Sequence, residues 1–96
     1  MKLLYRKGAI SDLDSIFDYT AKRWGRDQAA TYLGSFDAIF DSLLANPARG
    51  TIVETRRYVY RRLAHRSHVI YFRETNSQLI IARVLHQSMD ADRHLP

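Results

Sequence analysis

Cysteine is absent from this chain of 96 residues. Without cysteine there is no disulfide framework, no thiolate metal site and no cysteine nucleophile. The absence is compatible with a reducing cytoplasm, where protein disulfides are rare. Any binding or chemistry must therefore come from other side chains.

Long hydrophobic runs and low-complexity tracts are also missing. No apolar stretch approaches the roughly 18 residues that a membrane helix needs. The first residues, MKLLYRKGAI, are too short and too quickly charged for a signal peptide. With four Gly and two Pro, the composition is that of a packed domain. We expect one cytoplasmic domain over residues 1–96 that does not bind membranes.

Sequence motifs of catalysis are absent as well. There is no Gly-rich phosphate loop, no GxSxG motif and no Ser/His/Asp set in a recognisable context. The polar C-terminal stretch contains His86 and His94, but no HxxxH or HxH spacing. We therefore predict no catalytic residue, no metal and no cofactor. Acid–base chemistry by His86 stays an alternative, because its pKa range is suitable.

Basic side chains are concentrated in the second half of the chain. Residues 1–48 hold six basic and six acidic side chains, whereas residues 49–96 hold nine Arg against four acids. The net charge of +5 therefore belongs to the second half. Such a field suits nucleic acid or an acidic protein segment. Alternatively, the Arg residues only keep exposed strands soluble.

Apolar residues at helical spacing predict two helices after a short strand at residues 2–6. The first helix begins near Asp12 with a Ser11–Asp14 capping box, or a turn earlier near Gly8, and ends at Gly25. The second begins at Asp27 as N-cap and ends at Asn46-Pro47. Because their link is so short, the helices form an antiparallel hairpin, with Trp24 closing its end. The apolar positions are Leu13, Ile16, Phe17, Thr20 and Trp24, then Ala29, Tyr32, Leu33, Phe36, Ile39, Phe40, Leu43 and Leu44.

The last 40 residues predict three strands at residues 58–64, 69–73 and 79–85, all rich in β-branched and aromatic residues. Short connections make them antiparallel neighbours. Residues 47–55 are expected to be a loop or an irregular edge, and residues 90–94 a short final turn. The order β-α-α-β-β-β indicates an α+β fold, with the helical hairpin on one face of a mostly antiparallel sheet.

Arginines at strand positions suit the open face of such a sheet. Arg61, Arg62, Arg73 and Arg83 lie on three adjacent strands, and side chains alternate between faces with period two. This alternation puts Arg83 on the open face with Leu79, Ile81 and Leu85, and turns Ile80, Ala82 and Val84 towards the helices. Several Arg on one face form an anion or acidic-peptide site. The alternative is cross-strand pairing with Glu54, Glu74 or Asp90.

Four segments in order resemble the ParE branch of the RelE/ParE superfamily of type II toxins. They are DLDSIFDYTAKRWGRDQAATYL, NPARG, YRRLAHRSHVIYFR and RVLHQSMDADRHL, and they cover nearly the whole chain. The resemblance implies a RelE/ParE-like fold and a ParD-like antitoxin whose extended, largely helical segment wraps the toxin in a hetero-oligomer. It also implies a non-enzymatic toxin that traps DNA gyrase on cleaved DNA, without sequence-specific nucleic-acid binding of its own.

The RelE branch of this superfamily cuts mRNA in the ribosome, typically with a Tyr near the C-terminus. Here no Tyr follows Tyr71, which weighs against ribosome-dependent cleavage. That activity stays the runner-up hypothesis, and a toxin-like protein that only binds its antitoxin is the third. For action on the target, we predict contacts by Arg61, Arg83, His86, Gln87, Met89 and His94. For antitoxin binding, we predict Tyr32, Phe36 and Arg62.

Overall fold

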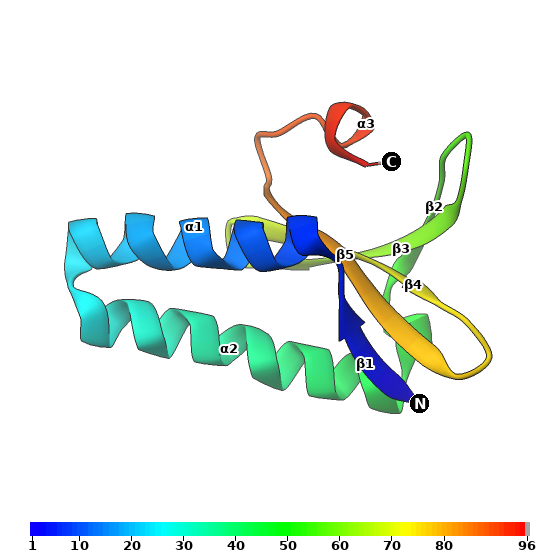
Figure 1. Ribbon diagram of the computed structural model, residues 1–96, viewed down its shortest axis with the longest axis horizontal. Coiled ribbons are helices and arrows are strands. Elements are labelled where there is room, and N and C mark those ends of the chain that lie inside the picture. Colours follow the sequence, from blue (N-terminus) through cyan, green and yellow to red (C-terminus); the bar gives the residue numbers. More distant parts are fainter. Residues whose placement is uncertain (96) are drawn as a thin grey trace.

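The structure is a computed structural model, which describes residues 1–95. A helical hairpin lies against one face of a five-stranded sheet (Figure 1). This confirms the predicted α+β class. None of the helices among these residues is long and apolar enough to cross a membrane. The elements are β1 (Lys2–Tyr5), α1 (Lys7–Trp24), α2 (Arg26–Ala45), a 3₁₀ turn (Pro47–Arg49), β2 (Thr51–Glu54), β3 (Val59–His65), β4 (His68–Glu74), β5 (Gln78–His86) and α3 (Ala91–His94).

The sheet has the strand order β1-β5-β4-β3-β2. β1 pairs in parallel with β5, and the other neighbours are antiparallel. The predicted strands are found, and their ends differ from the predicted ones by at most one residue. The sequence missed β2 as a regular strand, because only four residues of it pair along the edge of the sheet with β3.

The two helices are joined by a single residue, Gly25, whose φ of 93° favours glycine. This confirms the predicted hairpin. The predicted first cap is wrong, because α1 begins at Lys7 and Ser11 lies inside the helix. Asp27 lies in the first turn of α2 rather than at its N-cap. Helix ends depend on contacts with the strands, which the local pattern does not contain.

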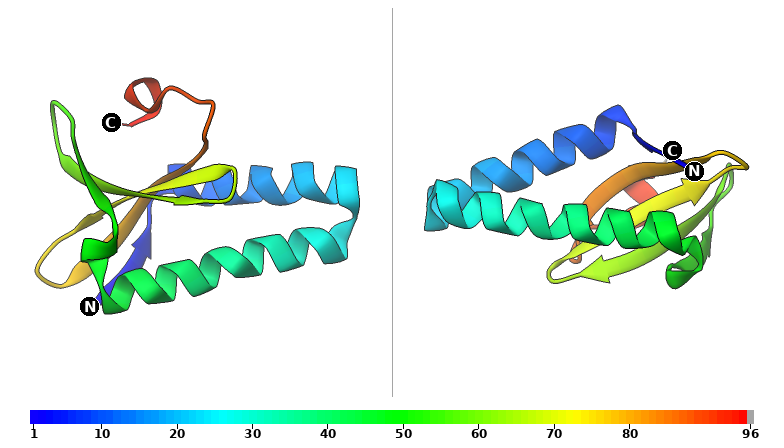
Figure 2. Two further views of the ribbon diagram at one scale, coloured as in Figure 1. Left: turned by 180° about the vertical axis from the view of Figure 1, so that it is seen from behind. Right: turned by 90° about the horizontal axis from the view of Figure 1, so that it is seen from below.

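The core lies between the hairpin and the facing side of the sheet. Figure 2 shows α2 crossing beneath the strands, with the Gly25 end of the hairpin reaching past the sheet. The core side chains come from α1, α2, β4 and β5: Ala9, Ile16, Phe36, Phe40, Leu43, Ile70, Phe72, Leu79, Ile81 and Val84. Burial of this apolar surface is the main force that holds the two layers together.

A β-bulge in β5 changes which side chains face the helices. Tyr71 pairs with Arg83 but Phe72 pairs with Ile81, so Ala82 is the extra residue. The alternation therefore reverses at Ala82. Leu79 and Ile81 pack in the helix-facing core, and their predicted outward orientation is wrong, as is the inward one of Ile80. Val84 faces the helices as predicted, and Arg83 and Leu85 lie on the opposite face.

Gly50 provides a test of the packing between the 3₁₀ turn and the sheet. A Cβ added at Gly50 would lie 2.5 Å from Phe72 Cζ and 2.9 Å from Arg61 Cβ. We expect Gly50→Ala to lower the free energy of unfolding by about 2 kcal/mol, because the buried ring must move. Gly34→Ala is the matched control. Its Cβ meets nothing within 4 Å, and it should raise stability by about 0.5–1 kcal/mol. Urea denaturation measures both, and equal effects would contradict this packing.

Candidate functional site

An open groove of about 920 Å³ lies between the projecting part of the hairpin and the nearby end of the sheet. α1 and α2 form one wall, and the β3–β4 turn and the end of β5 form the other. Its lining is mainly apolar. The lining residues are Asp12, Ser15, Ile16, Tyr19, Thr20, Trp24, Gln28, Tyr32, Arg66, Ser67, His68, Val84, His86 and Met89.

Exposed aromatic side chains form the rim of the groove. Trp24 is 62% exposed and Tyr19 is 59% exposed. The Arg23 guanidinium lies between them, with its Cζ 5.4 Å from the Tyr19 ring centroid and 5.2 Å from that of Trp24. Trp24 therefore does not close the hairpin as predicted, because the hairpin end extends beyond the sheet and has nothing to cover. Aromatic and Arg side chains of this kind are typical anchors of protein interfaces.

Histidines from three strands form a cluster beside the groove, and two of them, His68 and His86, line it. The Tyr32 hydroxyl and His68 Nδ1 are 2.8 Å apart, and the His68 and His86 rings meet edge to face at 5.5 Å. His65 Nε2 lies 2.8 Å from Ser35 Oγ and its ring packs edge-on against Phe36. Burial lowers the pKa of His68, and the neighbouring His86 and His65 lower it further. This cluster links the helices to the sheet.

One ring nitrogen of His86 makes local contacts with Ser88. Ser88 donates its backbone N–H to His86 Nδ1 over 3.1 Å, and the Ser88 hydroxyl lies 2.7 Å from the same atom. His86 Nδ1 is therefore occupied within its own turn. Across residues 1–95 no three His, Asp or Glu side chains are grouped so that they could hold a metal ion.

The His68 pKa predicts a loss of stability in acid. Because folding lowers this pKa below its ordinary 6.5, the group stabilises the fold fully above about pH 6.5, and this contribution is lost as pH falls through the folded pKa. The urea midpoint should therefore fall as the pH is lowered from about 7.5 to about 5.5, roughly one pH unit either side of that value. His68→Gln should make this dependence less steep, leaving the part due to His65, whose pKa burial also lowers. An unchanged slope in the variant would contradict the assignment.

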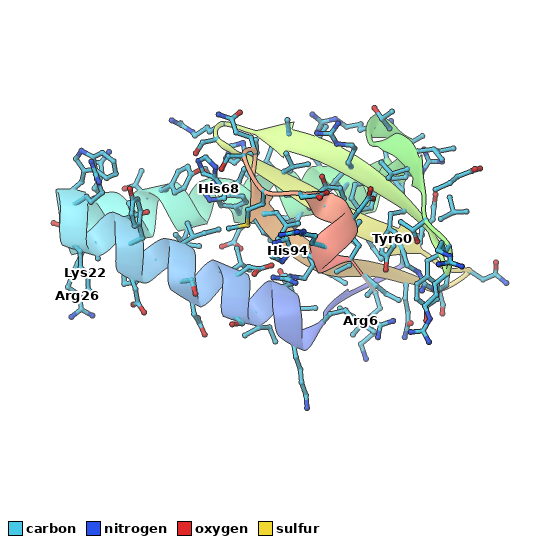
Figure 3. All side chains as sticks on the ribbon, turned by 90° about the horizontal axis from the view of Figure 1, so that it is seen from above. Arg6, Lys22, Arg26, Tyr60, His68 and His94 are labelled. Atoms are coloured by element: carbon cyan, nitrogen blue, oxygen red, sulfur yellow. The ribbon has the colours of Figure 1, made fainter. Side chains whose placement is uncertain are left out.

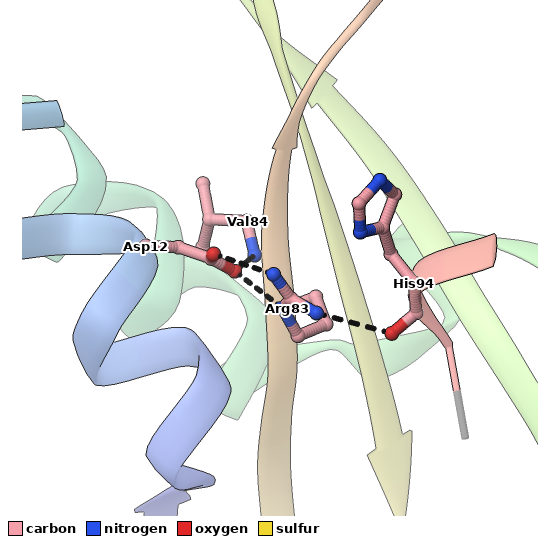
Figure 4. Close-up of polar contacts among 4 residues, drawn as sticks. All are labelled: Asp12, Arg83, Val84 and His94. Atoms are coloured by element: carbon pink, nitrogen blue, oxygen red, sulfur yellow. Dashed lines mark hydrogen bonds and ion pairs between the residues drawn. The ribbon is translucent and has the colours of Figure 1, made fainter. Parts of the chain in front are cut away.

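Arg83 joins the sheet to both α1 and the C-terminal segment (Figure 4). Its Nε and Nη2 donate to the Asp12 carboxylate over 2.7 and 2.8 Å, and its Nη1 donates to the His94 carbonyl over 3.1 Å. Asp12 Oδ2 also accepts from the Val84 backbone N–H over 2.9 Å. Asp12 thus provides an acceptor for the Val84 N–H, which lies beyond the part of β5 that pairs with β1. The hydrogen bond to Asp12 raises the pKa of Arg83.

The residues predicted to act on a target do not form one site. Arg61 and Arg83 lie on opposite faces, and each has a carboxylate partner, Glu74 and Asp12 respectively. The expected pairing of Arg61 with Glu74 is found, whereas the partner of Arg83 was missed. His86 and Met89 line the groove. Gln87 and His94 are exposed elsewhere on the C-terminal segment.

The residues predicted to bind the antitoxin also lie on different surfaces. Tyr32 lines the groove, and Arg62 is exposed on the sheet face away from the helices. Phe36 is fully buried, so its expected exposure is wrong; it lies on the core stripe of α2. Sequence reasoning missed Tyr19, Gln28 and Arg66 in the groove. Only Tyr19 carried a signal, an aromatic one helical turn before Arg23.

Comparison with known proteins identifies a family and two relatives that match most of the chain. Residues 3–91 match the family described as "ParE toxin of type II toxin-antitoxin system, parDE". The protein named Toxin ParE1 of Caulobacter vibrioides is 42% identical over 87 residues, which cover 91% of this chain and 90% of that protein. Toxin ParE1 of Mycobacterium tuberculosis is 40% identical over 95 residues, covering 98% of this chain and 97% of the relative.

A solved structure has the same fold. It is titled "Chromosomal ParDE TA system from P. aeruginosa", and its chain superposes with a TM-score of 0.77 at 20% identity. The match covers 90% of this chain and 95% of the solved chain. At 20% identity, this match shows that the two chains share the fold of helical hairpin and sheet.

Proposed function

Because the chain belongs to the ParE toxin family of type II toxin–antitoxin systems, we propose that it poisons DNA gyrase in the cytoplasm, and that a ParD-like antitoxin neutralises it. The observation that carries the antitoxin part is the groove beside the hairpin. It offers an apolar floor and two exposed aromatic side chains in a chain of this size. Exposed apolar surface of this kind marks an interaction site.

A helical segment with one apolar face is the occupant that the groove suits. The floor contributes Ile16 and Val84, and the rim contributes Tyr19, Trp24 and Met89 on either side. Helices bind such grooves through apolar side chains three or four positions apart. The polar groups of the groove, Gln28 and Arg66 among them, would then meet the polar flanks of the bound helix.

Action by binding, without catalysis, is the second part of the proposal. Two of the basic residues predicted to act on the target are engaged within the fold, Arg61 with Glu74 and Arg83 with Asp12. His86 Nδ1 is held by Ser88, and His68 Nδ1 lies against the Tyr32 hydroxyl. A general base needs a free nitrogen within reach of its substrate. These contacts favour a toxin that binds its target.

Expression of the chain in bacteria tests this proposal. Expression alone should stop growth, with filamentation and induction of the DNA-damage response, and co-expression of the adjacent ParD-like protein should restore growth. Cleaved mRNA in a translation reaction, with undamaged DNA in the cells, would instead establish a ribosome-dependent nuclease. Normal growth at high expression would establish a toxin-like fold that binds only its antitoxin.

A further inference from the structure

The sheet face away from the helices carries a row of basic and aromatic side chains. The strand register places Arg62, Tyr71 and Arg83 side by side across β3, β4 and β5. One step along the strands, Tyr60 of β3 and Arg73 of β4 lie on the same face. We call the surface formed by Arg6, Arg62 and Arg73 around Tyr60 the outer arginine face.

Guanidinium groups surround tyrosines that are themselves buried. Tyr60 and Tyr71 are 1% and 6% exposed, although no helix pair covers this face. The Arg73 guanidinium lies 3.9 Å from the centre of the Tyr58 ring, which meets the Tyr60 ring edge to face. Burial raises the pKa of Tyr60, while nearby Arg73 and Arg6 lower it. Figure 3 shows Arg6 and Tyr60 on the same side of the molecule, away from Lys22 and Arg26 at the hairpin tip.

These guanidinium groups have no carboxylate partner. Within residues 1–95, ion pairs join only Arg61 to Glu74 and Arg83 to Asp12. Glu54 and Asp92 line a hollow between the β2–β3 turn and the C-terminal segment, together with Arg56 and Arg57. The outer arginine face therefore keeps an uncompensated positive charge, and its Arg side chains offer rigid forks of donors that match phosphate oxygens.

The chemistry of the face favours phosphate over a protein partner. A protein interface has an apolar centre, often with exposed aromatic anchors. Here the aromatic rings are buried, and the exposed apolar side chains of the neighbouring strands, Ile52 and Val59, lie at positions that alternate with those of the face. Charge without an apolar anchor is typical of binding to a nucleic-acid backbone.

We propose that the outer arginine face binds the phosphate backbone of duplex DNA without regard to base sequence. The choice of DNA as the source of phosphate rests on the proposed action on gyrase, which holds a DNA duplex. In this arrangement the toxin contacts DNA through the sheet, while the groove on the other side of β5 is left for a protein.

Binding of a fluorescent DNA duplex to the purified toxin tests the proposal by anisotropy. The duplex is about 20 base pairs long, and salt is raised from about 50 to about 200 mM. We expect binding that weakens steeply with salt. The variant Arg62→Gln/Arg73→Gln should bind at least about tenfold more weakly, with a log–log salt slope smaller by about one to two. Arg6→Gln alone should show a smaller loss in the same direction.

The matched control removes the same number of positive charges at the opposite end of the molecule. Lys22→Gln/Arg26→Gln lies at the hairpin tip, which Figure 3 shows far from Arg6 and Tyr60. This control should bind DNA within about twofold of the unchanged protein. Equal weakening by both double variants would overturn the proposal, as would no binding at the lowest salt. Tighter binding of single-stranded RNA than of the duplex would overturn it in favour of RNA. Displacement of the duplex by polyglutamate at a concentration of negative charge below that of the DNA would overturn it in favour of an acidic peptide.

A gyrase assay separates this inference from the proposed function. DNA binding without any effect on gyrase would leave the outer arginine face established and refute gyrase poisoning. Gyrase inhibition by a toxin that does not bind DNA would refute only the outer arginine face. If both hold, Arg62→Gln/Arg73→Gln should need a higher concentration than the control to inhibit supercoiling.

Discussion

Replacing Asp12 by alanine is expected to lower the free energy of unfolding by about 2–3 kcal/mol. The Asp12 carboxylate accepts two hydrogen bonds from Arg83 and one from the Val84 backbone N–H. The side chains of Arg83 and Asp12 are only 25% and 13% exposed, so water replaces these partners poorly. Asp12→Ala leaves a charged group and a backbone donor unpaired at the edge of β5. Urea denaturation at neutral pH measures the loss.

Two further substitutions make this prediction specific. Asp12→Asn keeps an oxygen for the Val84 N–H but removes the charge opposite Arg83, so its loss should be intermediate. Asp14→Ala is the matched control, since Asp14 is an exposed residue of the same helix with no side-chain partner among the described residues. A loss for Asp12→Ala no greater than that for Asp14→Ala would show that the Asp12–Arg83 pair does not hold α1 to the sheet.

Removing both rim aromatics, in Tyr19→Ala/Trp24→Ala, should weaken antitoxin binding by about 100-fold. A loss of about 1.4 kcal/mol for each aromatic, above the roughly 1 kcal/mol that fewer than about a third of interface residues reach, corresponds to a factor of ten each and to about 100-fold for the pair. Both side chains are largely exposed, so the fold should lose little stability. Calorimetric titration of the toxin with the C-terminal segment of the antitoxin measures the affinity. Urea denaturation confirms that the variant is folded.

Ile10→Ala is the control for this loss of affinity. Ile10 is a half-exposed apolar residue of α1 that does not line the groove. Its removal should change antitoxin affinity by less than about threefold, which is within the near-neutral range for contacts outside an interface. Similar affinities for the groove variant and the control would mean that the antitoxin binds a different surface.

The local residue pattern was sufficient to locate the helices and three of the strands. The 3.6-residue stripe located both helices, and Gly25 marked their junction because its φ is positive. Runs rich in β-branched and aromatic residues located β3, β4 and β5 to within one residue. Period-two alternation then assigned the faces of their side chains. It failed within β5, because the single extra residue Ala82 reverses the faces. A bulge depends on pairing with β4, and one strand's sequence does not contain that information.

The candidate site was much less predictable. The groove exists because the hairpin is longer than the sheet beside it, which depends on how the layers are placed. The Asp12–Arg83 pair joins residues 71 positions apart, so no local pattern links them. The short final turn predicted at residues 90–94 is found, but the residues under it were not predicted: Ala91 and Leu95 pack over Val69, Tyr71 and Leu85 on the outer side of the sheet. The family resemblance supplied the function; the residues alone did not.

Fold-back of the C-terminal segment also changes how its role should be tested. Deleting residues after Gln87 would uncover the apolar cluster and remove the carbonyl that Arg83 binds. Loss of toxicity could then follow from loss of structure. Exposed side chains such as Met89 and His94 are better targets, because their replacement leaves the cluster covered.

The central claim is that this toxin poisons gyrase, and supercoiling of relaxed plasmid by purified gyrase tests it most directly. With the toxin at or above the gyrase concentration, supercoiling should stop and linear DNA should accumulate after denaturation of the protein. Addition of the antitoxin should restore supercoiling. Full supercoiling and no linear DNA at a large excess of folded toxin would contradict the account.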